Sequence, residues 1–224
     1  NPTEIEFDRD AKGKIVTAKL LATGEAVVIG GMTKMSKSKN NGIDPQTAID
    51  TYGADTVRVF TMFAAPPEQT LEWNDDGVSG AQRFLKRLWS YCSENQALIK
   101  SGQTLLDEKG LLNRAASEPA SEKIEQIRHD IHTALEKALN DFERNQFNTV
   151  IAACMTILNH LPNDPEFGGV AAEGCSALLR LLSPIAPHIC QQLWQQLAMG
   201  DDILNAQWPC VDNSALTKST IELV

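Results

Sequence analysis

The chain has 224 residues, of which 42% are hydrophobic and 22% are charged. This is the composition of a folded globular protein and excludes collagen-like and wholly disordered classes. With 20 basic against 29 acidic residues, the formal net charge is −9, which disfavours a nucleic-acid binder that depends on bulk positive charge.

Membrane and secretory classes are excluded by the pattern of apolar residues. No apolar run approaches the roughly 18 residues that would span a bilayer, and the N-terminus lacks a basic segment followed by an apolar one. The five cysteines are odd in number, widely spaced and mostly set in apolar stretches. This pattern indicates buried thiols in the cytoplasm rather than a disulfide framework. Position 1 is not methionine, and we expect the chain to be a segment of a longer protein.

The first 31 residues predict a small β-meander. Three short β-prone runs cover residues 5–7, 14–20 and 26–29, and turn-like pairs at 12–13 and 23–24 separate them. We expect these residues to form a β-rich segment.

A cluster of lysines follows the β-rich segment. Lys34, Lys37 and Lys39 stand within six positions, and no acidic residue lies between positions 32 and 41. The stretch has no periodicity that could bury a face, so it predicts an exposed, mobile loop. Ammonium groups interleaved with the hydroxyls of Ser36 and Ser38 can wrap a phosphate chain. The alternative, from composition alone, is a solvated linker.

Two short helices are predicted after this loop. Asp44 and Pro45 have the residue types of an N-cap and a first helical turn, and the helix should run through Asp50. Gly53 interrupts it, and residues 54–63 continue as a second helix that ends before the following prolines.

The remainder predicts an up-and-down helical bundle over about residues 76 to 199. Apolar residues recur three or four positions apart in successive segments, and helices with one apolar stripe must pack on each other. Residues 101–121 are expected to form a long loop. The stripes contain Val78, Leu85, Leu88, Trp89, Cys92; Ile124, Ile131, Leu135; Val150, Cys154, Ile157; Leu178, Leu182; Ile189 and Leu193.

Residues 34–38, Lys-Met-Ser-Lys-Ser, match the KMSKS signature loop of class I aminoacyl-tRNA synthetases. The surrounding chain resembles the leucine, isoleucine, valine and methionine branch of that family, at residues 40–45 and 52–58. It is similar to the bacterial leucyl enzymes in particular, at residues 63–68, 71–73, 77–81 and 83–89. Further on, residues 147–149, 184–189 and Trp194 resemble the helical tRNA-binding domain of the same enzymes, so the likeness spans about residues 14 to 210.

The resemblance implies a mainly α fold and three regions. Residues 1–31 would be the β-rich end of an insertion domain. Residues 32–75 would be the signature loop with the following helices of the catalytic and stem-contact region. Residues 76–224 would be a helical bundle of the class Ia anticodon-binding type, with the start of a truncated C-terminal segment.

The resemblance also implies the function of the parent protein. It would activate leucine with Mg²⁺-bound ATP to leucyl-adenylate and transfer the acyl group to tRNA(Leu), as a cytoplasmic monomer with no metal bound by this segment. Lys37 carries over as the key ATP contact and Lys34 as the flanking one. Met35 carries over as a packing residue beneath the loop, and Ser36 and Ser38 as donors that shape it.

One element of the family is absent. The class I enzymes also carry a His-x-Gly-His element, and no such sequence exists here; Pro187-His188-Ile189-Cys190 lacks the glycine and the second histidine. We therefore expect the chain to be inactive by itself. The alternatives are the equivalent segment of a valyl or isoleucyl enzyme, and an all-helical interaction module with a Lys/Ser linker.

Arg83, Lys86 and Arg87 form a basic patch at helical spacing. In this family the corresponding helix lies near the acceptor arm, so the resemblance implies that the patch contacts tRNA. The alternative is ordinary surface salt bridges.

Several other residues have simpler structural interpretations. His129 and His132 have a spacing that could ligate a metal, but no further ligands complete a site. His188 is expected to be a hydrogen-bonded packing histidine, and Asp55 and Arg58 are expected to pair with each other on their helix. The tryptophans at positions 73, 89 and 194 are expected in the core.

Overall fold

The computed structural model describes residues 4–11, 15–30, 33–39, 41–113 and 121–217. The chain divides into two compact units, with the boundary between Thr51 and Tyr52. Within the described residues, no helix is both long enough and apolar enough to cross a membrane.

The first unit contains a β-hairpin of strands β1 (Ile5–Arg9) and β2 (Ile15–Leu20). The strands are antiparallel, with Ile5 opposite Leu20 and an irregularity between Asp8 and Arg9. The expected third strand is wrong: residues 26–29 contribute only a single bridge, between Lys19 and Ala26. Val28 is 93% exposed, so this run has no buried face that would favour a strand. Both residues of the predicted turn at 12–13 lie outside the described ranges.

The unit continues through the 3₁₀ turn η2 (Lys37–Lys39) to helix α1 (Pro45–Tyr52). The Asp44 carboxylate accepts the backbone N–H of Thr47 at 2.8 Å, as an N-cap residue does. The predicted start of this helix is therefore confirmed.

The second unit begins with helices α2 (Ala54–Ala64) and α3 (Asp75–Glu94), separated from α1 by Gly53. Gly53 has φ +87°, a conformation that other residues rarely adopt. The Asn74 side chain caps α3 by accepting the N–H of Gly77. Trp73 packs edge-on against Phe60 of α2, with ring centroids 5.1 Å apart.

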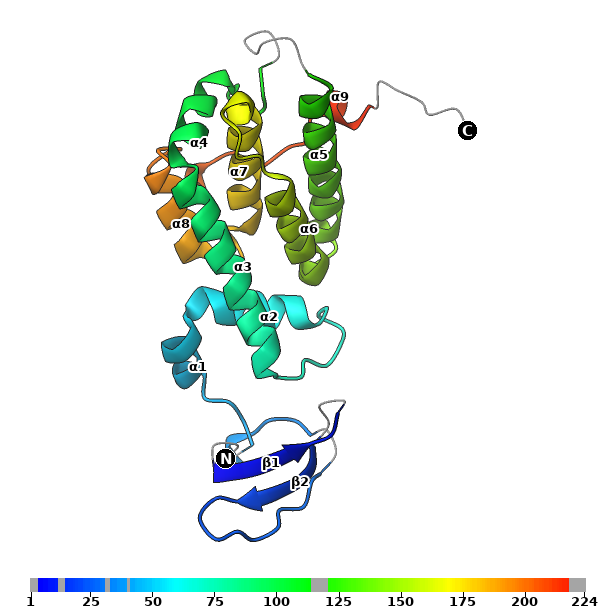
Figure 1. The fold of residues 1–224 in the computed structure, drawn as a ribbon. Helices are drawn as coiled ribbons and strands as arrows, with labels where there is room; N and C mark the ends of the chain where they lie inside the picture. The colour runs from blue at the N-terminus through cyan, green and yellow to red at the C-terminus, as the bar shows by residue number, and fades with distance from the viewer. Residues whose placement is uncertain (1–3, 12–14, 31–32, 40, 114–120, 218–224) are drawn as a thin grey trace. The chain divides into compact units, whose positions relative to one another are not determined.

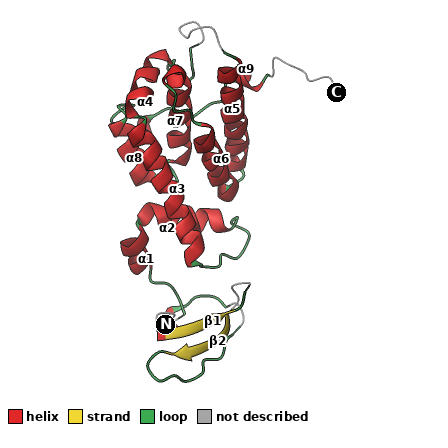
Figure 2. Ribbon diagram, viewed as in Figure 1, coloured by secondary structure: helices red, strands yellow, loops and turns green. Residues whose placement is uncertain are grey.

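The bundle is completed by α4 (Gln96–Gly102), α5 (Glu122–Glu143), α6 (Phe147–His160), α7 (Gly168–Leu182) and α8 (Pro187–Gln196). All fifteen residues of α7 are buried, and it packs against α4, α5, α6 and α8 at the centre of the bundle (Figures 1 and 2). The predicted helical bundle is thus confirmed. Short elements η3 (Gln103–Leu105), η4 (Pro165–Phe167), η5 (Ile203–Asn205) and α9 (Asn213–Leu216) accompany these helices.

The long loop expected at 101–121 is wrong in its first part. Ser101 and Gly102 end α4, and η3 follows directly. A tight turn then pairs Leu106 with Leu112, and the Asp107 carboxylate accepts the N–H groups of Lys109 and Leu111 at 2.9 Å. Side-chain hydrogen bonds of this kind stabilise turns locally, and the predicted loop extends on into undescribed residues 114–120.

A close crossing of α4 and α7 depends on glycine. A Cβ on Gly102 would lie 1.9 Å from the carbonyl oxygen of Gly168, whereas a Cβ on Gly80 in α3 would meet nothing closer than 3.7 Å. We expect Gly102→Ala to destabilise the chain by about 3 kcal/mol, because the helix backbones must separate. Gly80→Ala, the matched control, should be neutral or stabilise by up to about 1 kcal/mol. Urea denaturation of both variants would measure the difference, and equal stabilities would contradict this account of the crossing.

Candidate functional site

The lysine-rich loop is organised around Asn41 and Ser36. The Asn41 side chain accepts the backbone N–H of Ser36 at 2.8 Å and donates to the carbonyl of Lys34 at 3.4 Å. The backbone N–H of Lys39 donates to the Ser36 carbonyl at 3.2 Å. A single 3₁₀ turn therefore forms where the sequence predicted no regular structure.

The side chains of this loop present donors to solvent. Lys34 and Lys39 are exposed, and within the described residues neither forms an ion pair with a carboxylate. The Lys39 ammonium lies 3.4 Å from the Thr33 hydroxyl, and the hydroxyls of Ser36 and Ser38 lie 3.2 Å apart. The Lys37 side chain lies outside the described part. Unpaired ammonium groups beside hydroxyls can bind a phosphate chain.

Met35 departs from its expected position. Its side chain is 44% exposed, so in this chain it does not pack beneath the loop. A methionine needs an apolar surface to cover it, and the polar residues that surround it in the loop supply none.

The basic patch lies on α3, where Arg83, Lys86 and Arg87 are all exposed. The Lys86 ammonium donates to Gln82 at 3.2 Å, and Arg87 donates to Asn159 of α6 at 2.5 Å. In the described part of the chain no carboxylate pairs with these cations, so the salt-bridge alternative has no support there.

The expected inward position of Trp89 is wrong. Leu85 and Leu88 are buried, at 6% and 0% exposure, but Trp89 is 41% exposed. Spacing alone does not separate these positions, because Phe84 and Leu85 are also adjacent on α3 and both are buried, at 3% and 6%. Trp89 is exposed because the neighbouring helices do not cover it.

The expected pairing of Asp55 with Arg58 is also wrong. The Asp55 carboxylate accepts the N–H of Ile189 at 2.7 Å at the start of α8, while Arg58 donates to the carbonyls of Ile185 and Pro184 at 2.8 and 2.9 Å. Free N–H groups at a helix start attract a carboxylate, and free carbonyls after a helix end attract a guanidinium. One turn of α2 therefore holds both sides of the α7–α8 connection.

His188 belongs to the same contact. Its Nδ1 lies 2.8 Å from Asp55, which confirms the predicted hydrogen bond, but its side chain is 75% exposed. The expectation that His188 is a packing histidine is therefore wrong, because most of its imidazole is open to solvent.

A buried charged network joins α5, α7 and the C-terminal segment. Arg128 is fully buried, and its Nε and Nη2 donate to the two carboxylate oxygens of Glu173 at 2.8 and 2.9 Å. Nη2 also donates to Asp212 at 2.7 Å, and the backbone N–H of Leu112 donates to Glu173 at 2.8 Å. A single carboxylate thus ties together two helices and the turn between α4 and α5.

The pKa values of the two carboxylates follow from these contacts. Burial alone would raise the pKa of Glu173, but the Arg128 hydrogen bonds and the nearby His132 outweigh it and lower the pKa to about 2. For Asp212, burial raises the pKa, but the hydrogen bonds from Arg128 and Ser214 together outweigh it and lower the pKa to about 2. Both groups are held ionised inside a structural network.

The two histidines of α5 contact the C-terminal segment. His132 Nδ1 accepts the backbone N–H of Asp212 at 3.2 Å, and His129 Nδ1 lies 3.0 Å from the carbonyl of Ala215. Among the residues described, no group of three or more His, Cys, Asp or Glu side chains is placed to hold a metal. These contacts give both histidines a structural role.

The cysteines are free thiols, and those at positions 92, 154, 175 and 190 are buried, as predicted. Burial raises the pKa of Cys154 to about 12, so this thiol is unreactive.

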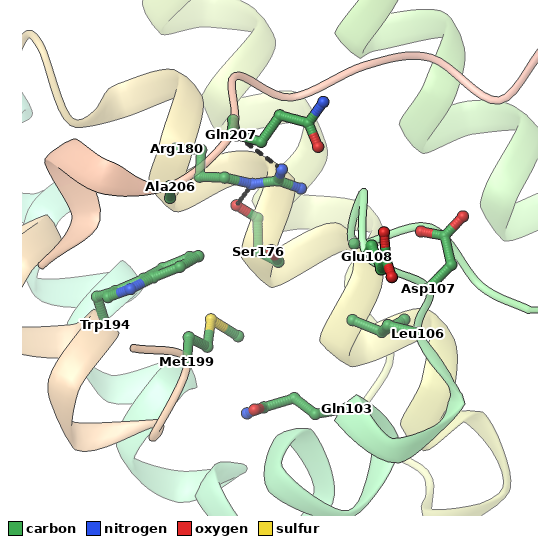
Figure 3. A pocket seen from close by; sticks show the side chains of 11 residues that line it. Gln103, Leu106, Asp107, Glu108, Ser176, Arg180, Trp194, Met199, Ala206 and Gln207 are labelled. Atoms are coloured by element: carbon green, nitrogen blue, oxygen red, sulfur yellow. Dashed lines mark hydrogen bonds between the residues drawn. The ribbon is translucent and has the colours of Figure 1, made fainter. Parts of the chain in front are cut away.

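A cavity of about 300 Å³ lies beside α7 and α8, where the turn at 106–110 meets residues 199–207 (Figure 3). Arg180, only 6% exposed, forms part of its wall. Its Nη1 donates to the carbonyls of Lys109 and Gln207 at 3.1 and 2.9 Å, and its Nε donates to the carbonyl of Ser176 at 3.2 Å. Arg180 thus joins two irregular segments to α7.

Comparison with known proteins identifies relatives of this chain. A model for class I tRNA synthetases (I, L, M and V) matches residues 19–74, and one for the anticodon-binding domain of tRNA ligase matches residues 125–224. Curated leucine–tRNA ligases from Azoarcus sp. and Aromatoleum aromaticum are 47% and 48% identical over 100% of this chain. The chain is a homologue of part of the bacterial leucine–tRNA ligases.

The likeness to the leucine–tRNA ligases extends to structure. A crystal structure of a ternary complex of Agrobacterium radiobacter LeuRS with tRNA and LeuAMS matches 82% of this chain and 23% of that one, with TM-score 0.71 and 27% identity. The chain covers 26% of each of the two curated relatives, about a quarter of their length. Residues 34–38 lie inside the synthetase match, and the α3 cations lie between the two matched regions.

Sequence reasoning missed the Arg128–Glu173–Asp212 network and the roles of Asp55 and Arg58. A signal for the first was present, because Arg128 stands in the apolar stripe between Ile124 and Ile131. A charge at a core position requires a buried partner. No comparable signal marked the α2 contacts, which depend on how distant segments meet.

Proposed function

We propose that this chain is the part of a bacterial leucine–tRNA ligase that closes on ATP and holds the body of tRNA(Leu). The identity of 47% over the whole chain to a curated leucine–tRNA ligase carries the proposal, and the Lys-Met-Ser-Lys-Ser loop supports it. In the complete protein, the leucine carboxylate attacks the α-phosphorus of Mg²⁺-bound ATP and releases pyrophosphate. A hydroxyl of the terminal adenosine of the tRNA then takes the acyl group of leucyl-adenylate, and AMP is released.

The loop stabilises the charge that develops on the departing pyrophosphate. Lys37 is the principal contact and Lys34 the flanking one, while Ser36 and Ser38 supply hydroxyl donors. Such a step needs little covalent chemistry from the protein, so positioning and electrostatic stabilisation supply most of the rate. Mg²⁺ arrives with ATP, and no residue of this chain is assigned to it.

The three regions of the chain have different roles. Residues 1–31 end an insertion domain, residues 32–75 carry the loop, and residues 76–224 bind tRNA through the α3 cations Arg83, Lys86 and Arg87. The complete protein acts in the cytoplasm as a monomer. The 224-residue chain alone does not aminoacylate, because it contains no His-x-Gly-His element for the other half of the ATP site.

The test is amino-acid-dependent ATP–pyrophosphate exchange by the complete protein, followed by charging of tRNA(Leu). We expect exchange with leucine and little with valine or isoleucine. Exchange driven by valine or isoleucine instead would assign the chain to a different branch of the family. Leucylation by the isolated chain would contradict the proposed division of the ATP site.

Removing the arginines of the α3 patch tests the tRNA contact. In the complete protein, Arg83→Ala with Arg87→Ala should weaken tRNA binding. The negative slope of the logarithm of the association constant against the logarithm of the salt concentration should become shallower by about 0.7 to 0.9 for each lost phosphate contact. Lys100→Ala, which removes an exposed cation on α4, is the control and should leave the slope unchanged. An unaltered slope in the double variant would remove both arginines from the interface.

A further inference from the structure

Trp89 is a large aromatic side chain that the bundle leaves uncovered. It is 41% exposed, like Trp208 at 43%, but Trp208 packs against the ring of Phe142 with centroids 5.0 Å apart. Within the described residues, Trp89 has no ring contact and its indole N–H has no hydrogen-bond partner. An exposed indole without a partner is free to contact another molecule.

The surroundings of Trp89 favour a polyanion. Residues three, four and seven apart share one side of a helix, so Trp89 lies beside Lys86 and Gln82, with Arg83 further round the same exposed surface. Residues 79–93 include no acidic residue in a chain of net charge −9, although Asp76 and Glu94 flank the stretch. We call the exposed side of residues 79–93 the α3 face. It combines cations with an aromatic ring, the pair of features that binds unpaired nucleotides.

The α3 face is held rigidly from behind. Leu88 is fully buried, and the Tyr91 hydroxyl donates to the carbonyl of Pro162 at 2.6 Å. A ring on a fixed helix loses little conformational freedom when a base stacks on it.

We propose that Trp89 is a stacking platform for an unpaired nucleotide of the tRNA, with Lys86 and Arg83 binding adjacent phosphates. This inference rests on the proposed function and adds the kind of nucleotide that the α3 face binds. A base inside an A-form helix presents no open face, so the nucleotide belongs to a loop, a bulge or an unpaired end. The contact tolerates any base, because each has a π face.

Variants of Trp89 in the complete protein separate stacking from charge and from simple apolar contact. We expect Trp89→Ala to weaken tRNA binding by about 5- to 100-fold, Trp89→Leu to weaken it as much, and Trp89→Phe to change it by less than about threefold because a flat ring remains. The salt slope should be unchanged in all three, since no charge is lost. Trp208→Ala is the matched control and should leave affinity for tRNA unchanged.

Each contrary outcome has a definite meaning. Wild-type affinity in Trp89→Ala overturns the inference, and so does wild-type affinity in Trp89→Leu, which would show an apolar contact only. Reduced thermal stability of Trp89→Ala without tRNA, at unchanged affinity, would show that another part of the protein covers the indole. A weakened Arg83→Ala, Arg87→Ala variant beside an unaffected Trp89→Ala would leave the proposed function standing and refute stacking alone.

Discussion

Replacing Lys37 by alanine in the complete protein should lower the rate of leucyl-adenylate formation by about 10²- to 10³-fold. The expected size follows from the loss of one preorganised charge that stabilises the transition state. ATP–pyrophosphate exchange at saturating leucine measures it directly. The effect should fall mainly on kcat, because charge on the departing pyrophosphate grows only as the bond breaks.

Lys39→Ala is the matched control for this loss. Lys39 is an exposed lysine two positions away, outside the Lys-Met-Ser-Lys-Ser string, and its ammonium lies near Thr33. We expect less than about a threefold change, so equal losses in both variants would show a general charge effect rather than a specific contact. If the loop is only a linker, Lys37→Ala will exchange at the wild-type rate and ATP will not protect Lys37 from acylation.

Replacing Glu173 by glutamine should destabilise the 224-residue chain by about 3 to 5 kcal/mol. The variant keeps the side-chain volume but removes the carboxylate that accepts two hydrogen bonds from buried Arg128 and leaves Asp212 as the remaining carboxylate partner. A buried charge that loses its main partner is strongly destabilising. Urea denaturation at pH 7 gives the free energy of unfolding. Glu136→Gln, an exposed position on the same helix as Arg128, should change it by less than about 0.5 kcal/mol.

The same network makes the free energy of unfolding depend on pH in the acid range. The pKa of Glu173 falls from its ordinary 4.5 to about 2 in the folded chain. Between those pH values the unfolded chain binds a proton at Glu173 that the folded chain does not. The stabilisation that ionised Glu173 contributes is therefore complete above about pH 5 and is lost as the pH falls toward 2. Glu173→Gln should lack this part of the loss, and an acid dependence identical to wild type would contradict the assignment.

Much of this fold could be predicted because its causes are local. Asp44 and Pro45 marked the start of α1, and the spacing of Val78, Leu85 and Leu88 marked the buried side of α3. These features depend on hydrogen bonds and apolar periodicity within a single helix. The loop at 34–38 could likewise be found from the order of its residues, although its composition alone is equally compatible with a solvated linker.

Features that depend on distant segments could not be predicted in this way. Asp55 and Arg58 stand three residues apart on one helix, a spacing that favours an ion pair. In the structure each forms hydrogen bonds with the backbone of the α7–α8 connection instead. Trp89 has the spacing of a core residue, and only the positions of the neighbouring helices leave it exposed. In both cases tertiary contacts decide between arrangements that are equally good locally.

The central position of α7 has a consequence for how the bundle opens. Because every one of its residues is covered by neighbouring helices, fraying at the ends of the other helices does not bring water to its backbone amides. Isotope exchange at those amides therefore requires cooperative opening of the second unit as a whole. The slowest-exchanging hydrogens of α7 would thus measure the global stability of the bundle rather than any local motion.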